Sequence, residues 1–451
     1  MTFWRFLLFV SCISCELLFI SSYTYQNMRY SIPYNKRSMY FEIPEEFNIT
    51  IVNPNSKSTV KNIATATKES LSHPINSKKL SEIAKEKSTA CIVVTDITRS
   101  CPEKELLPTI LEEIEKEINR KDITLLIASG MHREMSYDEK IEKYGKDIVD
   151  NYRIVDHNAK DQKTLVDLGI TKNGTPIRTS RIAAESELLV SLGVVEPHQY
   201  AGYSGGYKTV SIGVSGDETI SHTHSPKIVN DARTRVGNVK GNSFQEDMIE
   251  IGKKVGLDFI VNVILGKEKE ILEIRAGEPM ETHRMLIKDA KALYEVPVKK
   301  SFDVIVCGVG FPKDVNLYQT SRAASYVFYA PTQVVRNGGY IIIPAGCQEG
   351  AGTGVGEQRF FSLLKNNSLD EILSKNDEFR AGEQRAFVMA NVLKHCKVII
   401  VGSYMPQVVT DAKMIAAKDM EEAFGIVKND FGSNVDLLVI PNSLITLPII
   451  Q

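Results

Sequence analysis

The chain has 451 residues, of which 43% are hydrophobic and 24% are charged. These proportions are ordinary for a globular protein and exclude a disordered chain, a collagen-like chain and a polytopic membrane protein. Because 54 Lys and Arg face 56 Asp and Glu, the formal net charge is −2. No global basic field exists to hold nucleic acid or an anionic membrane, so we expect neither a nucleic-acid partner nor a stable membrane partner.

The first residues depart from this profile. Residues 6–20 read FLLFVSCISCELLFI and follow Arg5. The run is short for a bilayer span and contains Glu16. A basic start and an apolar core are typical of a signal peptide, but the exit SSYTYQN is a poor cleavage site. A third alternative is that translation starts at Met28 and that residues 1–27 are upstream sequence.

The rest of the chain shows apolar, β-rich runs that alternate with helical spacing. This alternation is typical of βα units around a parallel sheet. A second cycle begins near residue 295, so the sequence predicts an α/β protein with two α/β domains and mostly parallel sheets, residues 28–294 and 295–451. In chain order the predicted strands are 40–43, 49–52, 89–95, 122–129, 187–192, 302–307, 339–344, 396–401 and 435–440, with helices at 103–119 and from about Asn316.

Polar loops follow the predicted strands, and ligands of open parallel sheets gather at the carboxyl ends of the strands. The first loop contains Asp96, Thr98 and Arg99, whose carboxylate, hydroxyl and guanidinium could hold a phosphate or a carboxylate. The second, GMHR, contains His132, an imidazole suited to acid–base chemistry at neutral pH. The alternatives are a helix N-cap with a surface ion pair and a plain surface histidine.

The third loop, residues 196–208, reads EPHQYAGYSGGYK. Its three glycines and Ser204 predict close approach of the backbone to a ligand, and Lys208 could meet an anion or form a covalent bond. The spacing matches neither a P-loop nor GxGxxG. His198 lies in the same loop and is a second candidate acid–base group.

A fourth loop, SHTHSP, carries His222 and His224. Two imidazoles at this spacing could chelate a metal from a strand, but no third ligand lies at a regular spacing, so a zinc site is not specified. The alternative is a polar surface loop. Four of the chain's eight histidines nevertheless fall in these strand-end loops, which favours an active site with two acid–base groups and one metal or cofactor ligand.

The motifs DITR, GMHR, EPHQYAGYSGGYK and HS, in this order, resemble those of the nickel-pincer-dependent lactate racemase family. The resemblance covers nearly the whole chain after Met28, and the third motif is highly specific. It implies an N-terminal catalytic, cofactor-binding domain and a smaller C-terminal α/β domain, with the active site in the cleft between them. The extreme C-terminus is expected to pack back on the N-terminal domain.

The resemblance also implies the cofactor and the role of each site residue. The cofactor is nickel held by pyridinium-3-thioamide-5-thiocarboxylic acid mononucleotide, attached covalently to the lysine that matches Lys208. The enzymes that synthesise this cofactor are implied partners. The implied roles are nickel ligation by His224, acid–base catalysis by His132 and His198, cofactor binding by Asp96, Thr98 and Arg99, and substrate binding by Arg99, Gln319 and Arg322.

The implied reaction is racemisation or epimerisation at C2 of a 2-hydroxy acid, lactate or a related acid. C2 beside a carboxylate is a very weak acid, and hydride transfer avoids the carbanion by leaving a planar 2-keto acid. One histidine removes the hydroxyl proton, and the histidine on the opposite side returns it. The alternative is a protein of the same fold that binds cofactor or ligand without racemase activity, although such a protein has no need for both histidines.

Two departures from the family's lactate enzymes concern the substrate. Arg322 stands where those enzymes have Lys, and an arginine fork changes the geometry of a carboxylate clamp. Residues 383–386, EQRA, lack the Trp that those enzymes place beside the pocket, and Arg385 could face a second substrate carboxylate. The particular 2-hydroxy acid is therefore left open.

The resemblance bears on the start of the chain. Nothing before Met28 matches the family, and the five cysteines after it are dispersed, as is usual in a reducing compartment. A cofactor made in the cytosol fits poorly with an ordinary signal peptide. We therefore expect a cytoplasmic protein that starts at Met28, with residues 1–27 a mis-assigned start rather than a signal or an anchor.

Overall fold

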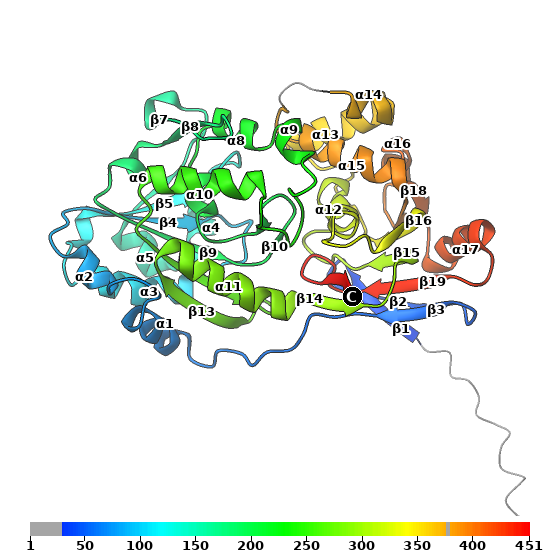
Figure 1. Ribbon diagram of the computed structural model, residues 1–451, viewed down its shortest axis with the longest axis horizontal. Coiled ribbons are helices and arrows are strands. Elements are labelled where there is room, and N and C mark those ends of the chain that lie inside the picture. The colour runs from blue at the N-terminus through cyan, green and yellow to red at the C-terminus, as the bar shows by residue number, and fades with distance from the viewer. Residues whose placement is uncertain (1–28, 376–378) are drawn as a thin grey trace, which may run out of the picture.

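Two α/β lobes, each built around a six-stranded sheet, lie side by side in the computed structural model (Figure 1). The structure describes residues 29–375 and 379–451, so the expectation for residues 1–27 lies outside the described residues. The predicted α/β class with two largely parallel sheets is confirmed. No helix of the described part of the chain is long and apolar enough to cross a membrane.

The first sheet has the strand order β13-β12-β9-β4-β5-β6, and only β12 and β13 pair antiparallel. Residues of β4 alternate between two cores, with Ile92 and Val94 on one face and Cys91 and Val93 on the other. Every residue of β4 is buried because helices cover both faces, as parallel sheets require. The strands are β4 (Ala90–Thr95), β5 (Ile123–Ala128), β6 (Arg153–Asp156), β9 (Leu188–Val194), β12 (Phe259–Leu265) and β13 (Ile271–Gly277).

Helices pack on both faces of this sheet. One face is covered by α1 (Ile63–Ser72), α2 (Leu80–Ala84), α3 (Glu103–Ile114), α4 (Tyr137–Tyr144) and α5 (Lys146–Asn151). The other face is covered by α6 (Arg181–Glu185), α7 (Lys208–Ser211) and α10 (Ser243–Val255). The long helix α11 (Pro279–Tyr294) packs against β12 and β13 and leads to the second lobe.

The second sheet has the order β18-β17-β16-β15-β19-β3 and is parallel throughout. Its strands are β3 (Asn48–Ile51), β15 (Phe302–Cys307), β16 (Val335–Pro344), β17 (Lys397–Val401), β18 (Ile415–Ala417) and β19 (Asp436–Ile440). One face carries α12 (Leu317–Phe328), α13 (Val355–Asn366), α14 (Leu369–Leu373), α15 (Glu383–His395) and α16 (Pro406–Asp411). The other carries α17 (Met420–Phe431) and the hairpin of β1 (Arg29–Tyr34) and β2 (Arg37–Glu42).

The two lobes exchange chain segments. Strand β3 pairs with β19, so the first described residues join the second sheet before the chain enters the first lobe at α1. Near the end, β20 (Leu447–Ile450) pairs in parallel with β14 (Glu295–Val298). Leu447 shares a core with Val195 and Tyr203 of the first lobe. The predicted boundaries, 28–294 and 295–451, stay a prediction, but these pairings show that the lobes are not simply consecutive.

Small elements connect the larger ones. Two antiparallel pairs lie outside the six-stranded sheets, β7 with β8 and β10 with β11. Neither pair is predicted by the hydrophobic pattern of the sequence. The remaining elements are η1 (Arg120–Asp122), η2 (Gln162–Thr164), β7 (Leu165–Ile170), β8 (Pro176–Ser180), β10 (Pro197–His198), β11 (Gly202–Tyr203), α8 (Asp217–Thr223) and α9 (Pro226–Val229).

Candidate active site

The loops after β4 and β5 lie together because the two strands are parallel neighbours. Asp96, at the end of β4, is buried, and its Oδ1 accepts hydrogen bonds from the Thr98 hydroxyl (2.6 Å) and the Thr98 N–H (3.1 Å). Its Oδ2 lies 2.5 Å from Nδ1 of the exposed His132. Burial alone would raise the pKa of Asp96, but the hydrogen bond and charge of His132 outweigh it and lower the pKa to about 2. The carboxylate thus fixes the proton of His132 on Nδ1 and leaves Nε2 as an acceptor.

The buried ion pair of Lys143 and Glu103 anchors the backbone of the loop after β4. The Lys143 ammonium donates to the Arg99 carbonyl (2.6 Å) and the Cys101 carbonyl (2.7 Å) and lies 2.9 Å from the Glu103 carboxylate. Glu103 also accepts the N–H and hydroxyl of Thr95. Sequence reasoning missed this pair, because both residues sit in helices rich in ordinary surface charge. Their burial fixes the loop backbone, while the Arg99 side chain stays exposed.

The glycines of the loop at 196–208 approach protein rather than an open ligand space. A Cβ on Gly202 would meet the Asn238 carbonyl at 2.2 Å, and one on Gly206 would meet the His283 ring at 2.4 Å. Both residues have φ between +58° and +75°, where glycine is favoured. Ser204 donates to the Val194 carbonyl. At these positions the glycines permit a tight chain reversal that sets the start of α7, and the close approach of this backbone to a ligand stays a prediction.

Lys208 is the first residue of α7. The pKa of its amine is lowered from 10.5 to about 7, chiefly by burial and next by the positive charge of Arg99, while the negative charge of Glu196 opposes the shift. A large fraction of the amine is therefore neutral at neutral pH, which makes it a competent nucleophile.

His198 lies in β10, directly before the tight reversal. The backbone N–H groups of Ala201 and Tyr200 donate to its Nδ1 at 3.1 and 3.3 Å. With Nδ1 accepting, the proton of the neutral ring resides on Nε2. Burial, followed by the charges of Lys208 and Arg99, holds the pKa of His198 well below its usual value.

His224 caps the end of α8, and its Nδ1 lies 2.8 Å from the Ile220 carbonyl. This contact leaves Nε2 with a free lone pair, and burial lowers the pKa of the ring to about 4, so the ring is neutral at pH 7. His222 instead contacts the Thr175 hydroxyl at 2.8 Å. Chelation of one metal by both histidines from a strand, raised as a possibility by their spacing, does not fit the structure, because the segment is a helix end that directs the two rings to different partners.

The second lobe reaches this region through α12. Ser325 donates to the Gln199 side-chain carbonyl at 3.0 Å, and the Tyr326 hydroxyl donates to the Pro197 carbonyl at 3.1 Å. Arg322, one turn before Ser325, is among the charges that lower the pKa of His198 after burial, Lys208 and Arg99. Gln319 has a buried side-chain oxygen that forms no hydrogen bond with any residue the structure describes. The structure thus brings residues of both lobes within electrostatic reach of one another: Arg99, His198, Lys208, His224 and Arg322.

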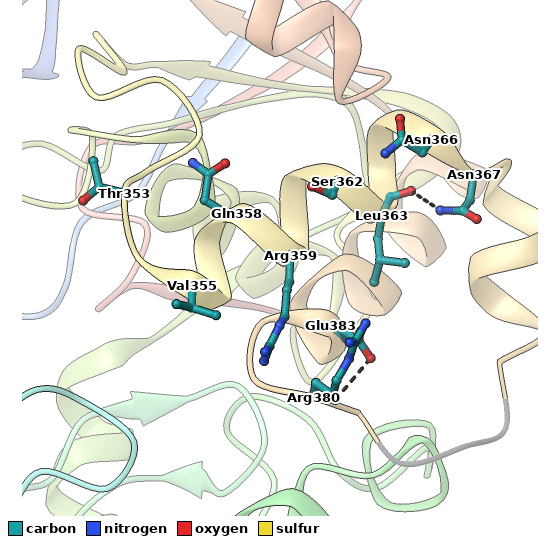
Figure 2. Close-up of a pocket in the computed structure, with 10 residues that line it drawn as sticks. All are labelled: Thr353, Val355, Gln358, Arg359, Ser362, Leu363, Asn366, Asn367, Arg380 and Glu383. Atoms are coloured by element: carbon teal, nitrogen blue, oxygen red, sulfur yellow. Dashed lines mark hydrogen bonds and ion pairs between the residues drawn. The ribbon is translucent and has the colours of Figure 1, made fainter.

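Two further observations concern metal-binding clusters and pockets. Among the described residues, no group of three or more His, Cys, Asp or Glu is arranged to hold a metal ion. A separate pocket of about 470 Å³ opens on the second lobe, along α13 and the start of α15. Figure 2 shows Arg359 and Arg380 beside Glu383 at its edge. None of the predicted site residues lines that pocket, so it is distinct from the candidate active site.

The two sheets and the strand-end loops define a two-domain α/β protein whose charged and nucleophilic side chains gather at one place. Residues 34–237 match the lactate racemase N-terminal domain, and residues 296–447 match the lactate racemase C-terminal domain. The chain therefore belongs to the lactate racemase family, and the resemblance found in its motifs is confirmed.

Known lactate racemases match this chain over nearly its whole length. The chain is 31% identical to the lactate racemase of Thermoanaerobacterium thermosaccharolyticum, and the match covers 92% of this chain and 97% of that protein. It is also 31% identical to the lactate racemase of Lactiplantibacillus plantarum, over 92% and 98%. The lactate racemase apoprotein structure from T. thermosaccharolyticum superposes with a TM-score of 0.84 at 29% identity, covering 93% of this chain and all of that one. A Thermotoga maritima structure with a TM-score of 0.66 and 17% identity shares the fold.

Proposed function

We propose that this protein is an isomerase that inverts the C2 stereocentre of a 2-hydroxy acid. The observation that carries the proposal is the Asp96–His132 pair together with the half-buried, neutral His198, on whose pKa the cations Arg99 and Arg322 act. Two imidazoles can take the proton of the substrate hydroxyl and return a proton to it, and the two cations can bind the substrate carboxylate. Family membership supports the same reaction.

We propose further that the cofactor is the nickel complex of the thiolated pyridinium mononucleotide, carried on Lys208. The residues present fit this group: the Lys208 amine has a pKa near neutrality, and His224 offers one free, neutral nitrogen. Since no set of three protein ligands exists among the described residues, a metal on His224 needs further ligands from a bound group. Thr98 and Arg99 would bind the phosphate of the cofactor. Asp96 would contribute to cofactor binding by orienting Thr98, and it would also orient His132. When bound, the group supplies a reversible acceptor for hydride.

The protein's own part is to move the proton. His132 Nε2 takes the hydroxyl proton of one enantiomer, and the buried Asp96 carboxylate stabilises the resulting imidazolium. On the opposite face of the planar 2-keto acid, we assign the same exchange to His198. Because Tyr200 and Ala201 donate to Nδ1, the resting proton of His198 is on Nε2 and the ring starts as a hydrogen-bond donor. For Nε2 to act as a base, this proton would move to Nδ1, and the two backbone hydrogen bonds to Nδ1 would be lost.

The test is to produce the protein together with the enzymes that synthesise the cofactor, the cytoplasmic partners we propose for it. Nickel, a mass adduct on Lys208 and racemisation of a 2-hydroxy acid are the expected results. Lys208→Ala should lose the adduct, whereas His132→Gln and His198→Gln should keep the adduct and lose racemisation. Absence of both nickel and adduct would overturn the proposal, and a loaded protein that racemises no acid would be a binding protein of the same fold.

A further inference from the structure

An arginine of the second lobe is buried, and no carboxylate of the described residues pairs with it. Arg385, in α15, is 4% exposed. One of its terminal nitrogens donates to the Ser325 hydroxyl at 3.0 Å, and its guanidinium lies 5.8 Å from the centre of the Tyr318 ring. Its Nε has no hydrogen-bond partner in the described part of the chain. The nearby carboxylate of Glu383 is taken by Lys375 and Arg380, both at 2.6 Å. A buried cation without a counter-charge is costly, and native proteins rarely keep one without a reason.

Other hydrogen-bond donors around Arg385 also lack acceptors. The Arg322 Nε, the Gln199 Nε2 and the Tyr200 hydroxyl are buried and have no partner among the described residues. Gln199 is tied to this place by the hydrogen bond that its carbonyl accepts from Ser325. Since buried polar groups are almost always satisfied, this excess of donors indicates an acidic ligand.

The two guanidiniums act on neighbouring groups of one region. Ser325 links Arg385 to Gln199, because its hydroxyl accepts from Arg385 and contacts the Gln199 side-chain carbonyl. Arg322 is one of the charges that lower the pKa of His198, after burial, Lys208 and Arg99. Arg385 is the first charge, after burial, that acts on the pKa of Tyr200, which it lowers, and Arg322 acts on Tyr200 in the same direction.

We propose that Arg385, with Gln199 and Tyr200, forms a subsite for a second carboxylate, and that the substrate is a 2-hydroxydicarboxylic acid. The inference rests on the proposed function, in which Arg99 and Arg322 bind the C1 carboxylate of the substrate. An arginine fork suits a carboxylate because it offers two parallel N–H donors. The second carboxylate supplies the missing counter-charge and acceptors for the unpaired donors.

The activity test uses the nickel-loaded protein with the pure enantiomers of lactate, malate and 2-hydroxyglutarate. We expect kcat/KM to be at least about tenfold higher for one of the dicarboxylates than for lactate. Arg385→Gln should lower that kcat/KM about a hundredfold, mainly through KM, as for loss of one partner of a buried charge pair. Lactate turnover should change by less than about threefold. Arg359→Gln, on α13 and half-buried, is the matched control and should change neither.

Equal efficiency on lactate and dicarboxylates, or an equal loss on both in Arg385→Gln, would overturn the second subsite while leaving the proposed function intact. Racemisation of no acid at all by the loaded protein would mean that the proposed function itself fails. A binding measurement on the apoprotein separates the cases. Malate should raise the thermal midpoint more than lactate does, and Arg385→Gln should abolish the difference. Arg385→Met should raise the midpoint without ligand, because it removes an unpaired buried charge; a fall would count against the proposal.

Discussion

Lys208 gains its reactivity from its surroundings. Burial and the charge of Arg99 bring the pKa of its amine to about 7. We predict that an acylating reagent labels Lys208 of the apoprotein with a pH midpoint near 7, measured by competitive labelling and mass spectrometry. Arg99→Gln should move the midpoint upward, because it removes a positive charge that disfavours the ammonium form. The exposed Lys418 serves as the internal reference. A midpoint unaffected by Arg99→Gln would show that Arg99 does not act on the amine.

Asp96 makes its hydrogen bonds to two neighbouring side chains of the site. Both of its oxygens are occupied, one by Thr98 and one by His132. We predict that Asp96→Asn keeps the fold and the adduct but lowers kcat by about 10² to 10⁴, as expected when a histidine loses the carboxylate that orients it. Chiral chromatography of the product gives the rate. Asp138→Asn, an exposed aspartate, is the control, and an unchanged kcat in Asp96→Asn would refute the orienting role.

At the scale of elements, the buried pair of Glu103 and Lys143 joins α3 and α4 to the loop after β4. Removing one partner leaves the other charge buried, so we predict that Lys143→Met lowers the free energy of unfolding by about 3 kcal/mol. The double variant with Glu103→Gln should recover most of that loss. Urea denaturation of the wild type, both single variants and the double variant gives the coupling energy. Additive losses would mean that the two side chains do not interact.

Local sequence patterns predicted the central strands well. The run at 302–307 coincides with β15, and those at 89–95 and 122–129 match β4 and β5 to within a residue at each end, because continuous apolar runs bounded by polar loops leave few alternatives. Helix α12 begins directly after the predicted Asn316, which caps it. The pair β10–β11 was missed because two-residue strands carry no periodicity. The contacts of Asn238 and His283 with the glycines of the same loop were beyond local patterns, because both residues lie in distant parts of the chain.

At the scale of the whole molecule, the pairings between distant parts of the chain were beyond local reasoning. Strand β3 pairs with β19, which is separated from it by nearly the whole chain, and β14 pairs with β20. Nothing in the four residues of β3 indicates which sheet they join. The same holds for the candidate site. The motifs identified its loops, but contacts such as those of Ser325 with Gln199 and Arg385 depend on how distant parts of the chain pack together.

Buried histidines link the stability of the molecule to pH. His283, in α11, is 4% exposed, lies 2.8 Å from the Ser204 carbonyl and has a pKa lowered to about 4, chiefly by burial. In the unfolded chain a histidine titrates near 6.5. Between pH 6.5 and 4 the unfolded state therefore binds the extra proton, and the free energy of unfolding falls as the pH falls, by up to about 1.4 kcal/mol per pH unit for each such histidine.

We predict that this slope is smaller in His283→Gln of the apoprotein by roughly the contribution of one histidine. Urea denaturation at pH 5.0, 5.5, 6.0 and 6.5 measures it. Carboxylates with raised pKa, such as Glu103, contribute slopes of the opposite sign, but these are common to wild type and variant and cancel in the difference. His395→Gln, at an exposed position, should leave the slope unchanged. Parallel curves for wild type and His283→Gln would show that His283 is protonated as readily in the folded protein as in the unfolded chain, and that its burial has no part in acid unfolding.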